Sequence, residues 1–201
     1  MARQNDLPFD RGTTYFGGNT PNTTDGANLE GKEYLVEDVA DANGNGGNGT
    51  GMYVRLRAVR NNAAFVLTPK RLIQAVAGRP GQTNGYAFVN PQQVLGVVDD
   101  QYGSNTIPVS DLFWAVVQGP CLVKSPLEGD VTNNIAVDGY LTNTTGATSG
   151  ATTAGRLAAL TIGGATSPLA SQILYSWGRA MSAKTTANSN VDVLCMVGKV
   201  Y

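Results

Sequence analysis

The residue types that most often carry hydrolytic chemistry are scarce in this 201-residue chain, which contains no histidine. Ser-His-Asp triads, Cys-His dyads and His-ligated zinc are therefore excluded. The only two cysteines, Cys121 and Cys195, cannot supply the four thiolates of an all-cysteine zinc site. Both lie in apolar stretches (GPCLV and VLCMV), which predicts small buried hydrophobic residues, while a disulfide between neighbouring strands stays open.

Carboxylate pairs for acid–base work are also hard to find. Such a pair has to converge on one substrate atom. Asp99 and Asp100 are adjacent in the turn-like DDQYG, and Glu128 and Asp130 lie in PLEGD, another turn-like sequence. We interpret both pairs as solvated loop residues. The sequence therefore predicts no enzyme activity, no cofactor and no metal.

A glycine-rich stretch at 44–49 matches GxGxxG, the dinucleotide fingerprint, and its surroundings begin like a calcium loop at Asp41. The fingerprint needs a following helix, but the stretch runs into the alternating, strand-like MYVRLRAVR. A calcium loop needs a bidentate glutamate at its twelfth position, which here is Met52. We interpret residues 41–51 as the connection of a hairpin.

Composition narrows the class of protein further. Charged residues make up 14% of the chain, against roughly 25% in typical soluble domains, and the net charge is −1. A surface without excess positive charge argues against sequence-independent nucleic-acid binding. No apolar run approaches the ~20 residues of a membrane span, and the first residues lack the apolar core of a signal peptide. Weakly charged surfaces suit packing into an assembly, but neutral loops of an ordinary β protein fit equally well.

Residues 33–40 and 52–60 alternate between apolar and polar side chains, which predicts two strands of a hairpin. The first strand belongs to an acidic stretch and the second to a basic one. These charges could match patches on another subunit, or they could pair within the hairpin. We favour pairing within the hairpin.

Residues 69–77 are predicted to form one short helix, with Thr68 as N-cap, Pro69 at the first helical position and Gly78 after the last turn. Residues 86–100 look extended, although Pro91 prevents a continuous central strand. From residue 109, short apolar segments recur roughly every ten residues, which favours a small barrel or sandwich. The expected fold is mainly β, with an extended N-terminal arm and one short helix.

Three segments in the last 93 residues carry a resemblance to a known family: FWAVVQGPCLVKSPL, LEGDVTNNIAVDGYLTNTT and ILYSWGRAMSAKTTANSNVDVLCMVGKVY. Their order of strand, glycine turn, Thr-rich loop and Val-alternating final strand resembles the phage capsid decoration (cement, head-stabilising) proteins, whose barrels are β-tulip-like. In this interpretation Gly178-Arg179-Ala180 turns the chain. Val191, Val193, Cys195 and Val197 then lie on the core face.

The resemblance implies a virion protein on the capsid exterior, made in the host cytoplasm, that binds the major capsid protein and neighbouring copies of itself, as a homotrimer. The implied parts are an arm (1–30), a hairpin and short-helix subdomain (31–108) and a β-rich decoration-like domain (109–201). We expect deletion of residues 2–20 to abolish capsid binding and to leave the β domain folded. The candidate partner-binding residues are Leu7, Phe9, Arg11, Tyr15, Phe16, Arg55 and Arg57.

Two alternatives stay open. One is a minor capsid, tail or fibre-associated structural protein, which would have a lower copy number than a decoration protein. The other is a carbohydrate-binding β-sandwich, which would need Trp114 or Trp177 exposed in a groove. Both tryptophans lie in apolar segments, so we favour core packing for them.

Overall fold

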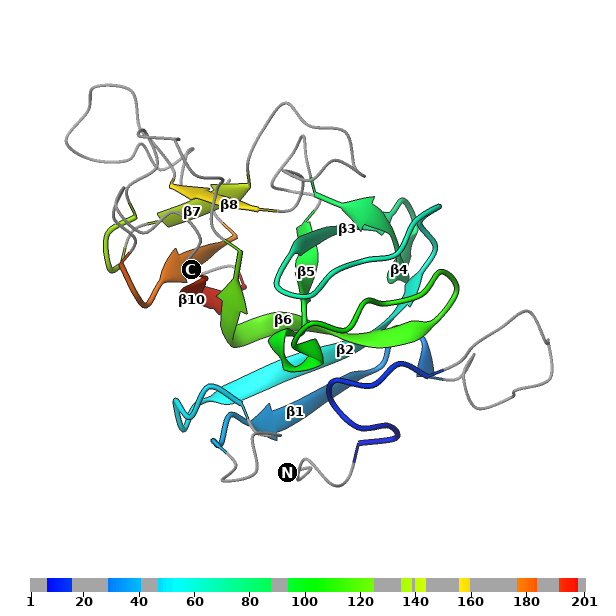
Figure 1. The fold of residues 1–201 in the computed structure, drawn as a ribbon, viewed down its shortest axis with the longest axis horizontal. Coiled ribbons are helices and arrows are strands. Elements are labelled where there is room, and N and C mark those ends of the chain that lie inside the picture. Colours follow the sequence, from blue (N-terminus) through cyan, green and yellow to red (C-terminus); the bar gives the residue numbers. More distant parts are fainter. Residues whose placement is uncertain are drawn as a thin grey trace.

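The computed structural model describes residues 7–15, 29–40, 47–87, 94–124, 135–138, 140–143, 156–159, 177–183 and 192–198. These residues form a mainly β structure, as predicted (Figure 1). Its strands are β1 (Glu33–Glu37), β2 (Tyr53–Asn61), β3 (Leu72–Val76), β4 (Arg79–Tyr86), β5 (Val94–Val98), β6 (Leu112–Val123), β7 (Tyr140–Asn143), β8 (Leu157–Ala159), β9 (Gly178–Ala180) and β10 (Val193–Val197). One 3-10 turn, η3 (Asp100–Tyr102), follows β5. No helix in the described ranges is long and apolar enough to cross a membrane.

Five strands close into a small barrel, which confirms the predicted architecture. Their order is β2-β4-β3-β5-β6, and β6 pairs back onto β2. The β2–β4 contact is parallel and the other four are antiparallel. Closure gives each of these strands two neighbours and so removes the exposed sheet edges that an open sheet would have.

Strand β6 belongs to two sheets. Its first half pairs with β2, and its second half, Gly119–Val123, pairs with β10, which leads on to β9, β7 and β8. Figure 1 shows β6 running between the barrel strands and the C-terminal group. Its side chains pack alternately into two hydrophobic clusters. Phe113 and Ala115 belong to one, and Trp114 and Val116 belong to the other. The long apolar run therefore has no polar face because both of its faces are buried.

The predicted hairpin is confirmed, since β1 pairs with β2 in antiparallel register from Glu33 opposite Arg57 to Glu37 opposite Tyr53. Alternation of polar and apolar side chains predicted it correctly because only one face of this hairpin is buried.

The predicted helix at 69–77 is wrong, because these residues form a turn and then β3. β3 pairs with β4 on one edge and with β5 on the other, so two strands satisfy its backbone groups. Leu72 packs into one hydrophobic cluster and Ile73 into the other, which requires the two-residue period of a strand. Lys70, inside the expected helix, has φ 65°, which a right-handed helix does not allow.

The interpretation of Gly178-Arg179-Ala180 as a turn is also wrong, since these residues form β9 and pair with β10 and β7. A side chain at Gly178 would lie 2.3 Å from the carbonyl oxygen of Met196, so the glycine allows close approach of the two strands. The predicted core face of the last strand is confirmed for Val193, Cys195 and Val197. Val191 lies outside the described residues.

Both cysteines are buried free thiols, as predicted, and they face each other across the β6–β10 pairing. Burial raises the pKa of each thiol above its ordinary value. We therefore expect neither Cys121 nor Cys195 to react with Ellman's reagent in the native protein at mildly alkaline pH, because only the thiolate is nucleophilic. Both should react once the protein is unfolded in guanidinium chloride. Rapid reaction of the native protein would show that these strands open readily.

Candidate functional site

The predicted partner-binding residues fall in two separate places. Leu7, Phe9, Arg11 and Tyr15 lie in the segment 7–15, which packs against the barrel of its own chain. Arg55 and Arg57 lie on β2. Phe16 lies outside the described residues.

The segment 7–15 is fixed to β6 by ring stacking and backbone hydrogen bonds. Phe9 stacks on Trp114 with ring centroids 4.3 Å apart, and the indole Nε1 of Trp114 donates to the Phe9 carbonyl at 3.0 Å. Tyr15 and Leu112 exchange two backbone hydrogen bonds of 2.9 and 3.0 Å. These contacts make this part of the predicted arm a component of the domain that it precedes in sequence.

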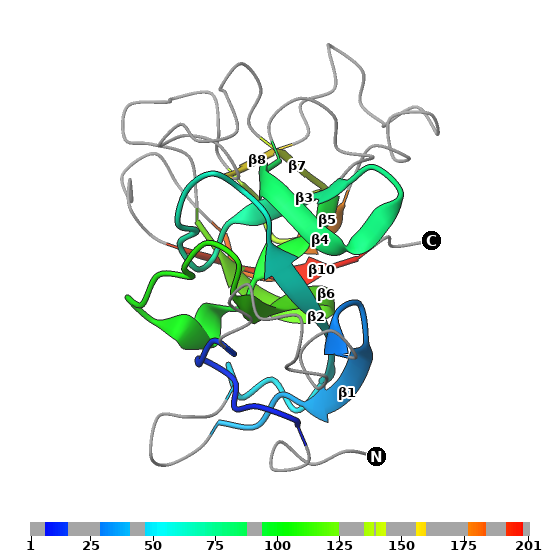
Figure 2. The same cartoon turned by 90° about the vertical axis from the view of Figure 1, so that its right-hand side faces the viewer.

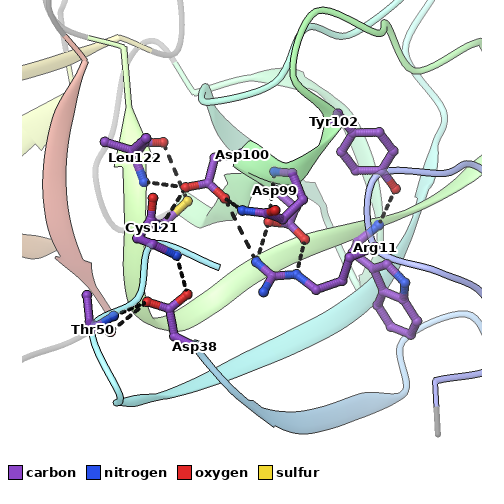
Figure 3. A network of polar contacts seen from close by, with 11 residues as sticks. Arg11, Asp38, Thr50, Asp99, Asp100, Tyr102, Cys121 and Leu122 are labelled. Atoms are coloured by element: carbon purple, nitrogen blue, oxygen red, sulfur yellow. Dashed lines mark hydrogen bonds and ion pairs between the residues drawn. The ribbon is translucent and has the colours of Figure 1, made fainter. Parts of the chain in front are cut away.

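A buried ion pair holds the same segment (Figure 3). Arg11 donates from Nε and Nη2 to the two carboxylate oxygens of Asp99, at 2.7 and 2.6 Å. The side chains are 2% and 0% exposed, so the pair is shielded from water. Burial raises the pKa of Asp99, and the guanidinium of Arg11 opposes that rise. Burial alone would lower the pKa of Arg11, but the Asp99 charge and hydrogen bond hold it above its ordinary value.

The interpretation of Asp99 and Asp100 as solvated residues is wrong, because the pair is buried. Asp100 accepts hydrogen bonds from Asn48 Nδ2 at 2.8 Å and from the backbone N–H of Leu122 at 2.9 Å. It thereby joins the hairpin connection to β6. The sequence signal that could have identified this was the position of the two acids directly after the apolar VLGVV, where a buried strand ends.

Asp38 completes this polar network at the end of the hairpin. It is fully buried and accepts from the backbone N–H of Asn48 at 2.7 Å and from the hydroxyl of Thr50 at 2.6 Å. Asp38, Asp99 and Asp100 all accept hydrogen bonds within the protein, and the described ranges hold no cluster of three or more potential metal ligands. Since its acceptors bind other parts of the chain, we interpret the network as structural.

The hairpin and its end carry the largest group of exposed apolar side chains among the described residues. Its large hydrophobic side chains are Leu35 (42% exposed), Val39 (48%), Met52 (41%) and Tyr53 (46%). Leu35 and Tyr53 lie on the same face, because Tyr53 is opposite Glu37 in the β1–β2 register. We call β1, these four side chains and the neighbouring Arg55 and Arg57 the hairpin surface.

β1 also presents an open backbone edge. Ala58 donates to the Lys32 carbonyl at 2.9 Å, and Asp38 donates to the Met52 carbonyl at 2.7 Å. In an antiparallel ladder the backbone groups of every second residue point the other way, so those of Glu33, Leu35 and Glu37 point away from β2. Within the described ranges no strand pairs with this side, and Figure 2 shows β1 as the outermost strand beside β2.

The charges of the hairpin pair internally, as we favoured. Arg57 donates to Glu33, and Arg55 lies 3.7 Å from the same carboxylate. Arg60 pairs with Glu30 at 2.8 Å. Glu37 makes no ion pair with the described part of the chain. Its carboxylate is therefore available to a basic residue of another molecule.

Both tryptophans are buried, Trp114 fully and Trp177 with 4% exposure, which confirms core packing. The carbohydrate-binding alternative therefore lacks the exposed indole rings on which it depended. No family model, no curated protein sequence and no solved structure matches this chain.

Proposed function

We propose that this protein is a capsid decoration protein, which binds the outer surface of a phage capsid and stabilises the mature head. Its partners are the major capsid protein and neighbouring copies of itself, in a homotrimer on the virion exterior, after synthesis in the host cytoplasm. The observation that carries the proposal is the hairpin surface, where an open strand edge and exposed apolar side chains occur together. The resemblance of the C-terminal segments supports the same class of protein.

The hairpin surface suits addition of a strand from another subunit. Glu33, Leu35 and Glu37 each offer an outward N–H and C=O, and each hydrogen bond formed contributes about 0.5–1.5 kcal/mol net. Covering the apolar side chains adds roughly 25 cal/mol for every Å² removed from water. Because the edge is already ordered by its pairing with β2, binding costs little conformational entropy on this side.

The negative charges of β1 indicate that the added strand comes from a different protein. If two copies paired their β1 strands antiparallel about Leu35, Glu33 of each copy would face Glu37 of the other. Like charges directly opposite each other destabilise a strand pair. A strand with lysine or arginine opposite Glu37 avoids this repulsion, so we infer that β1 binds the major capsid protein and that another surface forms the trimer.

The test is binding to capsids that were assembled without this protein. Wild-type protein should co-sediment with them at a copy number comparable to that of the major capsid protein. Leu35→Lys should weaken binding about tenfold or more, because it places a charge in the centre of the contact. Val66→Lys is the matched control, since Val66 is 51% exposed and lies outside the hairpin surface.

Equal binding by Leu35→Lys and Val66→Lys would exclude the hairpin surface as the contact. Failure of the wild-type protein to bind capsids would overturn the proposed function itself. A copy number far below that of the capsid protein would favour the minor virion protein instead.

A further inference from the structure

The interior of the barrel is filled by one of the two hydrophobic clusters. All five barrel strands contribute to it, with Val59 from β2, Ile73 from β3, Tyr86 from β4, Val98 from β5 and Phe113 from β6. At the end of the barrel where β3 turns into β4, residues of the same strands line a hollow of about 610 Å³. The hollow is therefore the mouth of the barrel, which is a frequent place for small-ligand sites.

Apolar side chains form the floor of this mouth. Val117 follows Ala115 along β6, and Leu95 packs against the interior cluster from β5. Val76 and Val94 also line the hollow. The four lining residues are only partly buried, so some of their apolar surface stays in contact with water. A ligand with an apolar body would remove this surface from water, which favours its binding.

The strand pairing is irregular around this mouth. The register between β2 and β6 skips Val117, which is therefore an extra residue in β6. The register between β3 and β4 also shifts, between Ala75 and Val76. Bulges of this kind are common at the rims of barrels, where they bend a strand and redirect a side chain. All three residues line the hollow, so the fold itself shapes the mouth.

Two arginines of β2 line the rim of the mouth, and they are held differently. Arg57 donates from Nε and Nη2 to Glu33, and from Nη1 to the Pro80 carbonyl at 3.5 Å. Arg55 approaches Glu33 only to 3.7 Å, which is longer than a hydrogen bond, and its side chain is 49% exposed. A guanidinium has five N–H donors. Arg55 therefore keeps donors for a ligand at the edge of the apolar floor.

We propose that the mouth of the barrel binds a small amphipathic carboxylate, with its hydrocarbon chain against Leu95 and Val117 and its carboxylate on Arg55. The planar guanidinium matches the two oxygens of a carboxylate. Glu33 lies beside Arg55 and repels a more highly charged head group such as phosphate. The volume is within the roughly 300–1,000 Å³ usual for small-ligand sites, so a chain of several carbons fits. The proposal does not depend on capsid binding, because it concerns the isolated protein.

The test is titration of the full chain with butanoate, hexanoate and octanoate, followed by amide NMR shifts at constant ionic strength. The amides of Leu95 and Val117 should shift saturably, and each added methylene should tighten binding about two- to fourfold. Octanoate should bind about tenfold more weakly to Arg55→Gln, because a charge-assisted contact is lost. Lys32→Gln is the matched control, since it removes the same charge from an exposed residue outside the described lining, and it should bind octanoate like the wild-type protein.

Titration with 1-octanol separates the two parts of the site. Octanol lacks the carboxylate, so it should bind equally to the wild-type protein and to Arg55→Gln, whereas Val117→Asn should weaken the binding of both octanol and octanoate. Unchanged amide shifts away from the hollow verify that the variants fold. The absence of a saturable shift with octanoate would overturn the proposal. So would affinities that do not rise with chain length, or equal octanoate affinity in the wild-type protein and Arg55→Gln.

Discussion

Replacement of Arg11 by methionine is expected to lower the free energy of unfolding by about 3–5 kcal/mol, because it leaves the Asp99 carboxylate buried without its cation. Methionine fills much of the space of the arginine stem, so the lost charge contributes more than lost packing does. The measurement is urea unfolding at neutral pH, compared with the wild-type protein. A loss below about 1 kcal/mol, typical of an exposed pair, would contradict the buried ion pair.

The double variant Arg11→Met/Asp99→Leu is the matched control, since it removes both charges together. Its stability should exceed that of Arg11→Met, because no uncompensated carboxylate remains. The pH dependence adds an independent check. Burial raises the folded-state pKa of Asp99, so without Arg11 the penalty is present above that pKa and disappears as the pH falls below the unfolded-state pKa. The deficit of Arg11→Met should therefore shrink on acidification, whereas that of the double variant should not.

The same contacts change what deletion of residues 2–20 should do. That deletion removes Arg11 and also Phe9, which covers one face of the Trp114 ring. Loss of capsid binding after the deletion would then follow from a weakened barrel as readily as from a lost arm contact. Point variants of the hairpin surface separate these two causes, because they leave the segment 7–15 intact.

Much of the fold was predictable because its strands follow simple periodicity. The hairpin of β1 and β2 alternates polar and apolar residues since one of its faces meets water. β6, with 12 residues, is longer than the short segments that the sequence predicts from residue 109 onward. In the structure the chain continues through Gly119 as one strand, since β2 and β10 pair with its two halves in turn. Such long-range pairing cannot be derived from local sequence.

The incorrect helix at 69–77 has a similar cause. The capping residues Thr68, Pro69 and Gly78 are compatible with a helix, but they are also compatible with tight turns. Lys70, Ser110 and Asp138 each have a left-handed φ, and each donates its N–H to a neighbouring strand at 2.8–2.9 Å. Each follows an aliphatic residue by three positions and precedes a strand. The recurrence indicates that the same kind of turn forms at all three places. Pairing of the strands on both sides of this turn outweighs the local helix propensity of residues 69–77.

The buried acids could not be placed from sequence because their partners are distant along the chain. Arg11 and Asp99 are separated by 88 residues, and Asn48 and Asp100 by 52. Charged residues in Gly- and Gln-containing turns are usually solvated. The apolar VLGVV before the two acids is a sign of their burial, but it does not identify their partners. The hairpin surface was predicted in part. Arg55 and Arg57 were candidate partner-binding residues, whereas the neighbouring apolar residues were not.

The second large effect is expected at Gly119, where β6 leaves β2 and begins to pair with β10. Gly119 has φ 108°, and a side chain there would lie 2.5 Å from the carbonyl oxygen of Tyr53 and 2.9 Å from the Cα of Val54. Gly119→Ala should therefore lower the free energy of unfolding by about 2–6 kcal/mol, the sum of backbone strain and overpacking. Urea unfolding measures this loss directly.

Gly78→Ala is the matched control, because Gly78 also has a positive φ of 73° but its side chain would meet nothing within 4 Å. It should lose only about 1–2 kcal/mol, the cost of the left-handed conformation itself. The difference between the two variants isolates the contact between β6 and β2. Since the strained atoms belong to Tyr53 and Val54, Gly119→Ala should also displace the end of the hairpin and weaken capsid binding more than its stability loss alone explains. Equal stability losses at the two glycines would mean that β6 can shift away from β2 without cost, and the hairpin surface would then lack a rigid support.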